Sequence, residues 1–447
     1  MTVPAQRRTA PEPDPGPDGD PAVARALELV DPARVTALLQ ELVRIPSTTG
    51  SAAESEAQHR LARVLDAAGT DVDLWRIDLD ETTADPDFPG MEAPRDEAWG
   101  LVGSTGDGDG PVLVLNGHVD VVPAGDRSAW TTDPFSGELR GGRVLGRGAC
   151  DMKAGLVSAL VAVEALHAAG VRLRGRLQLQ SVVGEEDGGL GTFATLRRGY
   201  RGDAAVITEP TRTGLVTTTA GALTFRLRVP GLSAHGSMRL EGVDAVEKYL
   251  LVHTALRALE ARRNRDAHPS MAGYALPYPI SVGTVRAGEW PSSVPDLLVA
   301  EGRYGVAVGE PVEDARRELE QAVAEVCAAD PWLREHPVEV EWWGGQFASG
   351  AVPDGSLLPA SVLDAHAVLH GRTPGVAGVP YGSDQRLLTG LGGVPTVVYG
   401  PGDVALAHAP DESAPVDEAV QVARTLVLLA ARTCGTRVLA PAEALQR

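Results

Sequence analysis

Histidines and acidic residues recur in this sequence directly after short apolar runs. Residues 112–115 are Val-Leu-Val-Leu, and His118 and Asp120 follow within five positions. The pattern repeats along the chain: Asp151 precedes an expected helix, Glu185 and Glu186 follow 177–183, Glu209 follows 204–207, and His408 follows 396–399. Open α/β sheets bind ligands beyond the carboxyl ends of their strands. We therefore expect these side chains to gather at one edge of a sheet.

Carboxylates gathered in one place repel one another, and burial raises their pKa values. A divalent metal ion offsets that repulsion. Two histidines with three or four carboxylates suit zinc or a neighbouring transition metal, and one bridging carboxylate would hold two ions roughly 3.5–4 Å apart. Taken alone, each of these residues also fits a solvated loop acid or a capping group. Their recurrence at five consecutive strand ends favours a metal centre.

Adjacent residues at such a centre would have different roles in metal binding and proton transfer. Glu185 and Glu186 are adjacent, and one glutamate cannot both hold a metal tightly and carry protons, so the pair predicts one ligand and one general base. Asp120 lies two residues from His118 on the same strand face and could accept the second imidazole N–H. Its alternative role is that of a loop acid.

These motifs make the chain similar to the M20 metallopeptidase family over roughly residues 36–435. The family comprises dizinc amidohydrolases, including acetylornithine deacetylase, succinyl-diaminopimelate desuccinylase and glutamate carboxypeptidase, and the chain most resembles acetylornithine deacetylase-like deacylases. The resemblance lies in five segments: 117–123 (GHVDVVP), 146–153 (GRGACDMK), 184–186 (GEE), 233–235 (SAH) and 381–386 (YGSDQR).

The resemblance implies a role for each position. His118 and Glu209 would bind one zinc ion, Glu186 and His408 the other, Asp151 would bridge them, Glu185 would be the general base, and Asp120 would orient His118. It also implies two Zn²⁺ per subunit, with Co²⁺ or Mn²⁺ as substitutes, and a homodimer. In the alternative assignment, Glu186 is the base and Glu185 is merely solvated.

Four further residues are candidates for contacts with the substrate. His235 would stabilise the oxyanion, in related enzymes at the partner subunit's site, although a turn cap is its alternative role. Arg303 matches an arginine that in relatives clamps the substrate carboxylate, and a bidentate guanidinium suits that task. Arg386 is a second such candidate, and a surface ion pair is the alternative for both. Ser292 stands where relatives often carry an asparagine.

The elements that must position these residues alternate between strand and helix. The pattern predicts an α/β fold: a doubly wound, mostly parallel sheet carrying the dizinc site. Helices are expected from near Pro21 to Val43 and over 152–169. A βαββαβ order, with strands near 223–229, 280–285, 297–306 and 338–342 and helices over 243–262 and 312–328, predicts an inserted α+β domain. This domain resembles the lid and dimerisation domain of the M20 family.

The expected boundaries divide the chain into four parts. A proline-rich tail over 1–21 is expected to be disordered, because it has too little apolar sequence to order itself. The catalytic domain is expected over 22–215 and 344–447, on either side of an inserted domain over 216–343.

Composition excludes several classes of protein. Sixty acidic residues against 40 basic ones give a formal charge of −20 over 447 residues, which disfavours partnership with nucleic acid or anionic membranes. Three scattered cysteines cannot form a disulfide framework, and no apolar stretch reaches the ~18 residues of a membrane helix. The N-terminus lacks the apolar core of a signal peptide. We expect a cytoplasmic protein.

The expected function is that of a zinc-dependent amidohydrolase. It would remove an acyl group from an N-acyl amino acid, as acetylornithine deacetylase does. The alternative is an M20-type dipeptidase or carboxypeptidase that cleaves a peptide bond next to a free carboxylate.

Residues 189–194 imitate a dinucleotide fingerprint, but the preceding acidic turn would repel a pyrophosphate. A catalytically inactive relative would lack the base or a ligand, whereas every one is present.

Overall fold

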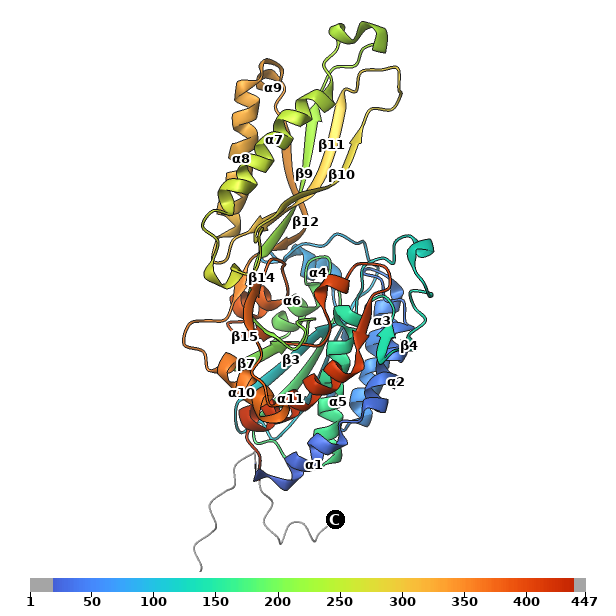
Figure 1. Ribbon diagram of the computed structural model, residues 1–447, viewed down its shortest axis with the longest axis vertical. Helices are drawn as coiled ribbons and strands as arrows, with labels where there is room; N and C mark the ends of the chain where they lie inside the picture. Colours follow the sequence, from blue (N-terminus) through green and yellow to red (C-terminus); the bar gives the residue numbers. More distant parts are fainter. Residues whose placement is uncertain (1–18, 438–447) are drawn as a thin grey trace, which may run out of the picture.

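The computed structural model describes residues 19–437, so all but the last three residues of the expected tail over 1–21 lie outside the described part. Figure 1 shows a larger unit that carries a broad sheet and a smaller, elongated unit above it. The expected α/β class with an additional α+β unit is confirmed. Among the described residues, no helix combines the length and apolar character needed to span a membrane.

The larger unit is built on a nine-stranded mixed sheet. Its strands, in spatial order, are β1 (Asp71–Arg76), β2 (Trp99–Thr105), β6 (Arg176–Val182), β3 (Val112–His118), β7 (Ala204–Ile207), β15 (Thr396–Val398), β8 (Leu215–Thr219) and β13 (Gly350–Ala351), with β14 (Val376–Val379) also paired to β8. The central run β6-β3-β7-β15 is parallel, and β1, β2 and β13 are antiparallel to their neighbours. The carboxyl ends of the four central strands therefore lie at one edge.

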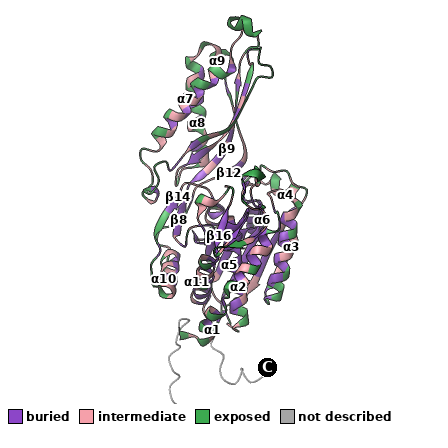
Figure 2. Ribbon diagram, turned by 45° about the vertical axis from the view of Figure 1, so that its right-hand side comes forward, coloured by how far each residue is buried: buried purple, intermediate pink, exposed green. Residues whose placement is uncertain are grey.

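Helices cover both faces of this sheet. On one face the apolar core combines alternate strand residues such as Leu113 and Leu115 with side chains of α2 (Pro32–Val43), α3 (Ala52–Ala67), α5 (Ala154–Ala168), α10 (Leu358–His370) and α11 (Val416–Cys434). On the other face, Val114 packs with α6 (Leu190–Arg197) and the turn 387–391. Figure 2 shows how completely the central strands and α5 are buried. Burial on both faces explains why these strands are apolar runs.

Two helical segments differ from the expectation. The expected helix from Pro21 to Val43 is two helices, α1 (Pro21–Leu29) and α2. Pro32 cannot continue a helix but suits its first turn, and Asp31 caps α2 by accepting a hydrogen bond from the Ala33 amide at 2.9 Å. The helix expected from 152 begins instead at Ala154, because 149–153 form an irregular turn in which Asp151 has an extended conformation.

The smaller unit follows the expected βαββαβ order. Its elements are β9 (Gly221–Pro230), α7 (Ala245–Arg263), β10 (Ile280–Ala287), β11 (Leu297–Val306), α8 (Val312–Ala329) and β12 (Glu339–Phe347), with the short α9 (Pro331–Glu335) before the last strand. The sheet order is β10-β11-β9-β12, all antiparallel, and α7 and α8 share its core. The exact domain boundaries stay a prediction; by pairing, β8 belongs with the larger sheet although it begins at the expected boundary.

Candidate metal centre

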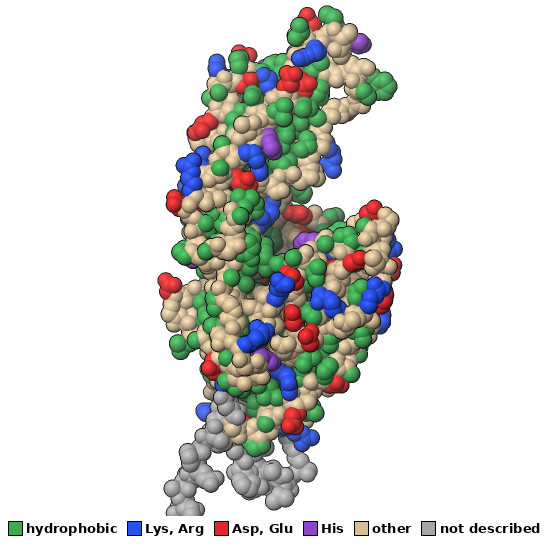
Figure 3. All heavy atoms as spheres, in the orientation of Figure 1, with side chains coloured by type: hydrophobic (Ala, Val, Ile, Leu, Met, Phe, Trp, Pro, Cys, Tyr) green, Lys and Arg blue, Asp and Glu red, His purple; other side chains and the backbone are tan. Residues whose placement is uncertain are grey.

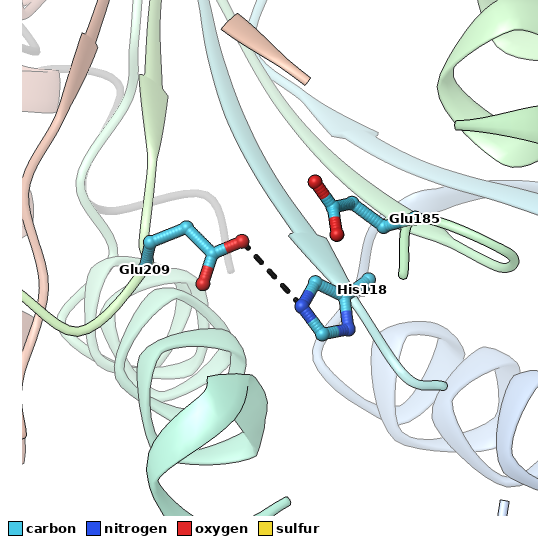
Figure 4. A group of neighbouring side chains, drawn as sticks. All are labelled: His118, Glu185 and Glu209. Carbon is cyan, nitrogen blue, oxygen red and sulfur yellow. Dashed lines mark ion pairs between the residues drawn. The ribbon is translucent and has the colours of Figure 1, made fainter. Parts of the chain in front are cut away.

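Three neighbouring strands deliver the first group of candidate ligands. His118 is the last residue of β3, Glu185 follows β6 and Glu209 follows β7. Because these strands are parallel, the three side chains emerge at the same edge, and Figure 4 shows the carboxyl groups of Glu185 and Glu209 next to the His118 ring. One ligand atom from each lies within 4.8 Å of the others, and all three residues are buried.

Asp151 lies between the two candidate histidines. Its Oδ1 is 3.2 Å from His118 Nε2, and its Oδ2 is 3.5 Å from His408 Nε2. His118 Nε2 is also 3.4 Å from Glu209 Oε1, and His408 Nε2 is 3.1 Å from Glu186 Oε2. The two carboxylate oxygens thus face two separate groups, each with one histidine and one glutamate. This is the arrangement that a bridging carboxylate needs.

The electrostatics of this cluster call for cations. Burial, followed by the negative charge of Asp151, raises the pKa of Glu209 to about 8, and burial also raises the pKa of Glu186. Hydrogen bonds to Asp151 and Glu186 raise the pKa of His408 to about 11. The protein alone therefore draws protons into the cluster to offset its negative charge. Imidazole and carboxylate donors in this number fit two divalent transition-metal ions, so the residues present fit the implied metal centre.

The cluster is open on the His408 side. The His408 side chain is 53% exposed, whereas that of His118 is 1% exposed. His408 has a backbone φ of 59°, a conformation that few residues other than glycine adopt, in the loop after β15. A substrate would therefore approach from the side of Glu186 and His408. In Figure 3, the molecular surface is hollowed between the two units.

Asp120 takes a different position from the expected one. His118 Nδ1 donates to the backbone oxygen of Asp120 at 2.9 Å, while the Asp120 carboxylate is 3.7 Å away. That carboxylate instead accepts hydrogen bonds from the backbone amides of Glu185 and Glu186, both at 3.2 Å. The strand end thus fixes the imidazole through its main chain. The Asp120 side chain fixes the turn that carries the two glutamates.

Glu412, which the sequence pattern did not single out, holds the segment around Asp151. Its Oε1 accepts hydrogen bonds from the amides of Cys150 at 2.9 Å and Asp151 at 3.1 Å, and its Oε2 accepts one from Arg147 Nη1 at 2.6 Å. Arg147 and Glu412 are both buried. Arg147 lies in the 146–153 motif, but nothing in the local sequence connects it to a residue 265 positions later.

A second unforeseen group supports the glutamate turn from behind. Glu54 accepts hydrogen bonds from the amides of Gly184 at 3.1 Å and Gly50 at 2.8 Å. The side chain of Arg95 is fully buried, and its guanidinium lies 3.3 Å from Asp187 and 3.7 Å from Glu54. Gly184 has φ of 65°, and a Cβ there would lie 2.3 Å from an Arg95 nitrogen, so the turn needs glycine at this position.

Arg386 is occupied by protein groups in this structure. Its guanidinium donates to the backbone oxygens of Ser383 at 3.0 Å and Gly188 at 2.7 Å, and it lies 3.8 Å from the Asp384 carboxylate. Burial, followed by the charge of Asp384, raises the pKa of Glu185 well above its usual value. Arg386 and Asp384 therefore form the wall behind Glu185. A contact of Arg386 with substrate stays a prediction.

The other expected substrate contacts lie in the smaller unit. Arg303, on β11, is half-buried and donates to the Pro380 oxygen at 2.9 Å, beside the 381–386 motif. His235 is exposed and its Nδ1 lies 2.8 Å from Ser237 Oγ. The Ser292 backbone oxygen accepts a hydrogen bond from the Gly236 amide at 2.6 Å, so the segments of Ser292 and His235 lie together. The structure does not bring His235 into the metal cluster of the same chain.

Comparisons with known proteins find a matching family and similar proteins. Residues 114–432 match the model of the family described as peptidase family M20/M25/M40. The chain is 29% identical to N-formyl-4-amino-5-aminomethyl-2-methylpyrimidine deformylase of Halalkalibacterium halodurans, over 90% of this chain and 94% of that one. It is 30% identical to succinyl-diaminopimelate desuccinylase of Stenotrophomonas maltophilia, over 85% and 93%.

A solved structure extends the comparison to the fold. The dipeptidase Dug1p of Saccharomyces cerevisiae superimposes with a TM-score of 0.72 at 14% identity, covering 92% of this chain and 98% of the other. At that identity the likeness concerns the fold alone. Both units of the present structure are thus found together in another protein.

Zinc binding is expected to release protons at neutral pH. In the metal-free protein the pKa of Glu209 is about 8 and that of His408 about 11, so both side chains carry protons at pH 7. Because metal ligands must be deprotonated, the apparent zinc affinity should rise between pH 6 and pH 8. Calorimetric titration in buffers of different ionisation enthalpy measures the number released. His408→Ala should release fewer protons, and an absence of proton release by the unmodified protein would contradict this account.

Proposed function

The chain belongs to peptidase family M20/M25/M40, and on that premise we propose that it is a dizinc deacylase that removes a small acyl group from a primary amine. The observation that best supports this proposal is the position of Asp151: one of its carboxylate oxygens faces His118 and the other faces His408. Members of this family hydrolyse amide bonds, and the complete set of candidate ligands and a candidate base supports the same activity here.

The proposed ligands divide into two groups. His118 and Glu209 would hold one zinc ion, Glu186 and His408 would hold the other, and the Asp151 carboxylate would be shared between them. When bound, zinc supplies Lewis-acid chemistry, which acidifies water and polarises the amide carbonyl group. The mixed nitrogen and oxygen donors suit zinc, and Co²⁺ or Mn²⁺ are expected substitutes.

Glu185 is proposed as the general base. Its raised pKa, which comes from burial and from Asp384, makes its carboxylate a stronger base than an exposed glutamate. It accepts the proton of the attacking water and then donates it to the nitrogen of the leaving amine. The Asp120 carboxylate fixes its backbone amide at 3.2 Å, so the base is held beside His118.

The substrate proposed is an N-acyl amine with a small acyl group. The similar deformylase and desuccinylase are named for removing a formyl and a succinyl group, and together they cover most of this chain. An N-acyl amino acid, as for acetylornithine deacetylase, is one member of this class. Dipeptide hydrolysis is the second candidate, supported by the shared fold with Dug1p.

A panel of amides tests the reaction class. N-formyl, N-acetyl and N-succinyl amines, N-acetylornithine among them, and unmodified dipeptides are offered to zinc-loaded protein, and amine release is measured with a chelated control. We expect chelator-sensitive release from one acyl series. Cleavage of dipeptides alone would replace the deacylase by a peptidase, and no cleavage with two metal ions bound would contradict the proposed function.

Replacing the proposed base should separate chemistry from metal binding. Glu185→Gln keeps the size of the side chain but cannot accept a proton, so kcat should fall by about 10²–10⁴. Its zinc content, measured by elemental analysis, should stay at two ions per chain. Asp151→Ala is the contrasting variant, because it should lose zinc as well as activity. A Glu185→Gln enzyme that retains its rate would show that another residue is the base.

We also propose that the protein is a homodimer formed through the smaller unit. The α7 helix exposes Val246, Leu250 and Leu251, and β10 is an edge strand on which Val285 is exposed. Such an apolar face beside a free strand edge suits a second copy of the chain. In that dimer, His235 would stabilise the oxyanion at the partner subunit's site, with Ser292 next to it.

Sedimentation velocity tests the dimer. We expect a dimer at micromolar concentration, converted toward monomer by Leu250→Glu, while Leu357→Glu, at an exposed position on the larger unit, serves as the control. A monomeric unmodified protein would contradict the proposal.

A cytoplasmic location is likewise proposed, supported by three cysteines that form no disulfide.

A further inference from the structure

A cavity of about 230 Å³ lies where the smaller unit meets the larger one. Tyr274 reaches it from the segment before β10, and the turn 269–271 of the same segment packs against β14. Figure 1 shows β14 at the base of the smaller unit. The larger unit contributes Tyr381, the loop 210–216, and the residues at the start and end of β14.

The cavity adjoins the metal centre on two sides. Pro210, in its wall, directly follows the candidate ligand Glu209. Asp403, also in its wall, has its backbone oxygen 3.3 Å from Cys150 Sγ, and Cys150 precedes the bridging Asp151. Tyr381, another lining residue, is also affected by the metal centre: burial and then the charge of Glu209 raise its pKa well above the usual value. Tyr381 therefore lines the cavity and lies close enough to the ligand carboxylates for their charge to act on it.

The lining determines what kind of group could enter. Ala377 and Val404 provide accessible aliphatic surface, next to the largely buried Leu215, Val216 and Val379. Two tyrosine rings provide flat surface. The charged side chains among the lining residues are Arg212 and Asp403, which lie 3.3 Å apart and offset each other's charge. A charged occupant would therefore leave water without a matching countercharge, whereas an uncharged flat group would contact mainly apolar surface.

We propose that this cavity binds an uncharged, flat apolar or aromatic group on the amine side of the substrate. The inference rests on the proposed deacylase function and makes it narrower. With a small acyl group at the metal centre, the amine portion is the part of the substrate large enough to extend past Tyr381. The cavity then selects acylated amines that carry such a ring. Arg303, the expected carboxylate contact, is not among the lining residues.

Two variants alter the cavity without touching the ligands. Tyr274→Ala removes an exposed ring, with Leu276→Ala, two residues away and outside the lining, as its control. Gly375→Leu places a side chain where a Cβ meets no atom within 4 Å, so it should extend into the open space of the cavity. Gly273→Leu is the matched control, because its Cβ is equally free and Gly273 does not line the cavity.

The variants are compared on N-formylbenzylamine, which carries a ring, and N-formylglycine, which carries none. Both cavity variants should raise KM for N-formylbenzylamine about tenfold, the loss expected for one ring contact. They should leave kcat and the KM for N-formylglycine unchanged, and both controls should behave as the unmodified enzyme. Equal effects on the two substrates, or none on either, would overturn the inference.

A binding measurement keeps the test independent of turnover. Benzamide, an uncharged aromatic amide, is titrated into zinc-loaded protein and its Kd is followed by ligand-observed NMR. We expect Gly375→Leu to weaken binding at least fivefold, with Gly273→Leu unchanged. If neither substrate is cleaved, the deacylase proposal fails, and the benzamide result alone decides on the cavity: equal binding by the variant and the unmodified protein overturns it.

Discussion

The mutual repulsion of carboxylates is the constraint around which the larger unit is organised. Asp151, Glu185, Glu186 and Glu209 meet at one sheet edge, and burial makes their charges costlier than they would be in water. A bound pair of divalent ions would offset that charge from within. The surrounding carboxylates of Asp120, Glu54 and Glu412 add further negative charge, which backbone amides and the buried side chains of Arg147 and Arg95 partly offset.

The surrounding carboxylates hold backbone rather than metal. Asp120 and Glu412 each accept hydrogen bonds from two main-chain amides of the segments that carry the candidate ligands or base. Glu54 accepts one from Gly184, just before the base, and one from Gly50. An amide donor cannot lose its proton, so these contacts persist whether or not the ligands are protonated. The buried Lys153 side chain donates hydrogen bonds from Nζ to the Leu42 and Ile45 oxygens, both at 2.9 Å, and so ties the Asp151 segment to the end of α2.

Local sequence patterns predicted most helices and strands well. They also predicted the candidate ligands, because those residues come directly after the apolar runs of the strands. The bounds of β7 and β11 match the expected runs, because burial on a regular strand leaves a clear apolar pattern. The patterns were weaker where the deciding contact is distant. The role of Glu412 depends on a partner hundreds of residues away, and the position of the Asp120 side chain depends on the geometry of the turn after β6. Neither leaves a mark in the local sequence.

The order of the ligands along the chain has a consequence for synthesis. His118, Asp151, Glu186 and Glu209 precede the smaller unit, whereas His408 and the supporting Glu412 follow it. A nascent chain therefore presents its carboxylates long before the second histidine exists. In the sequence, the smaller unit stands between the ligands up to Glu209 and the later His408. Because it has its own core, it can fold before the site is complete. Completion of the metal centre is then among the last events of folding, and a chain that ends before residue 408 cannot assemble it.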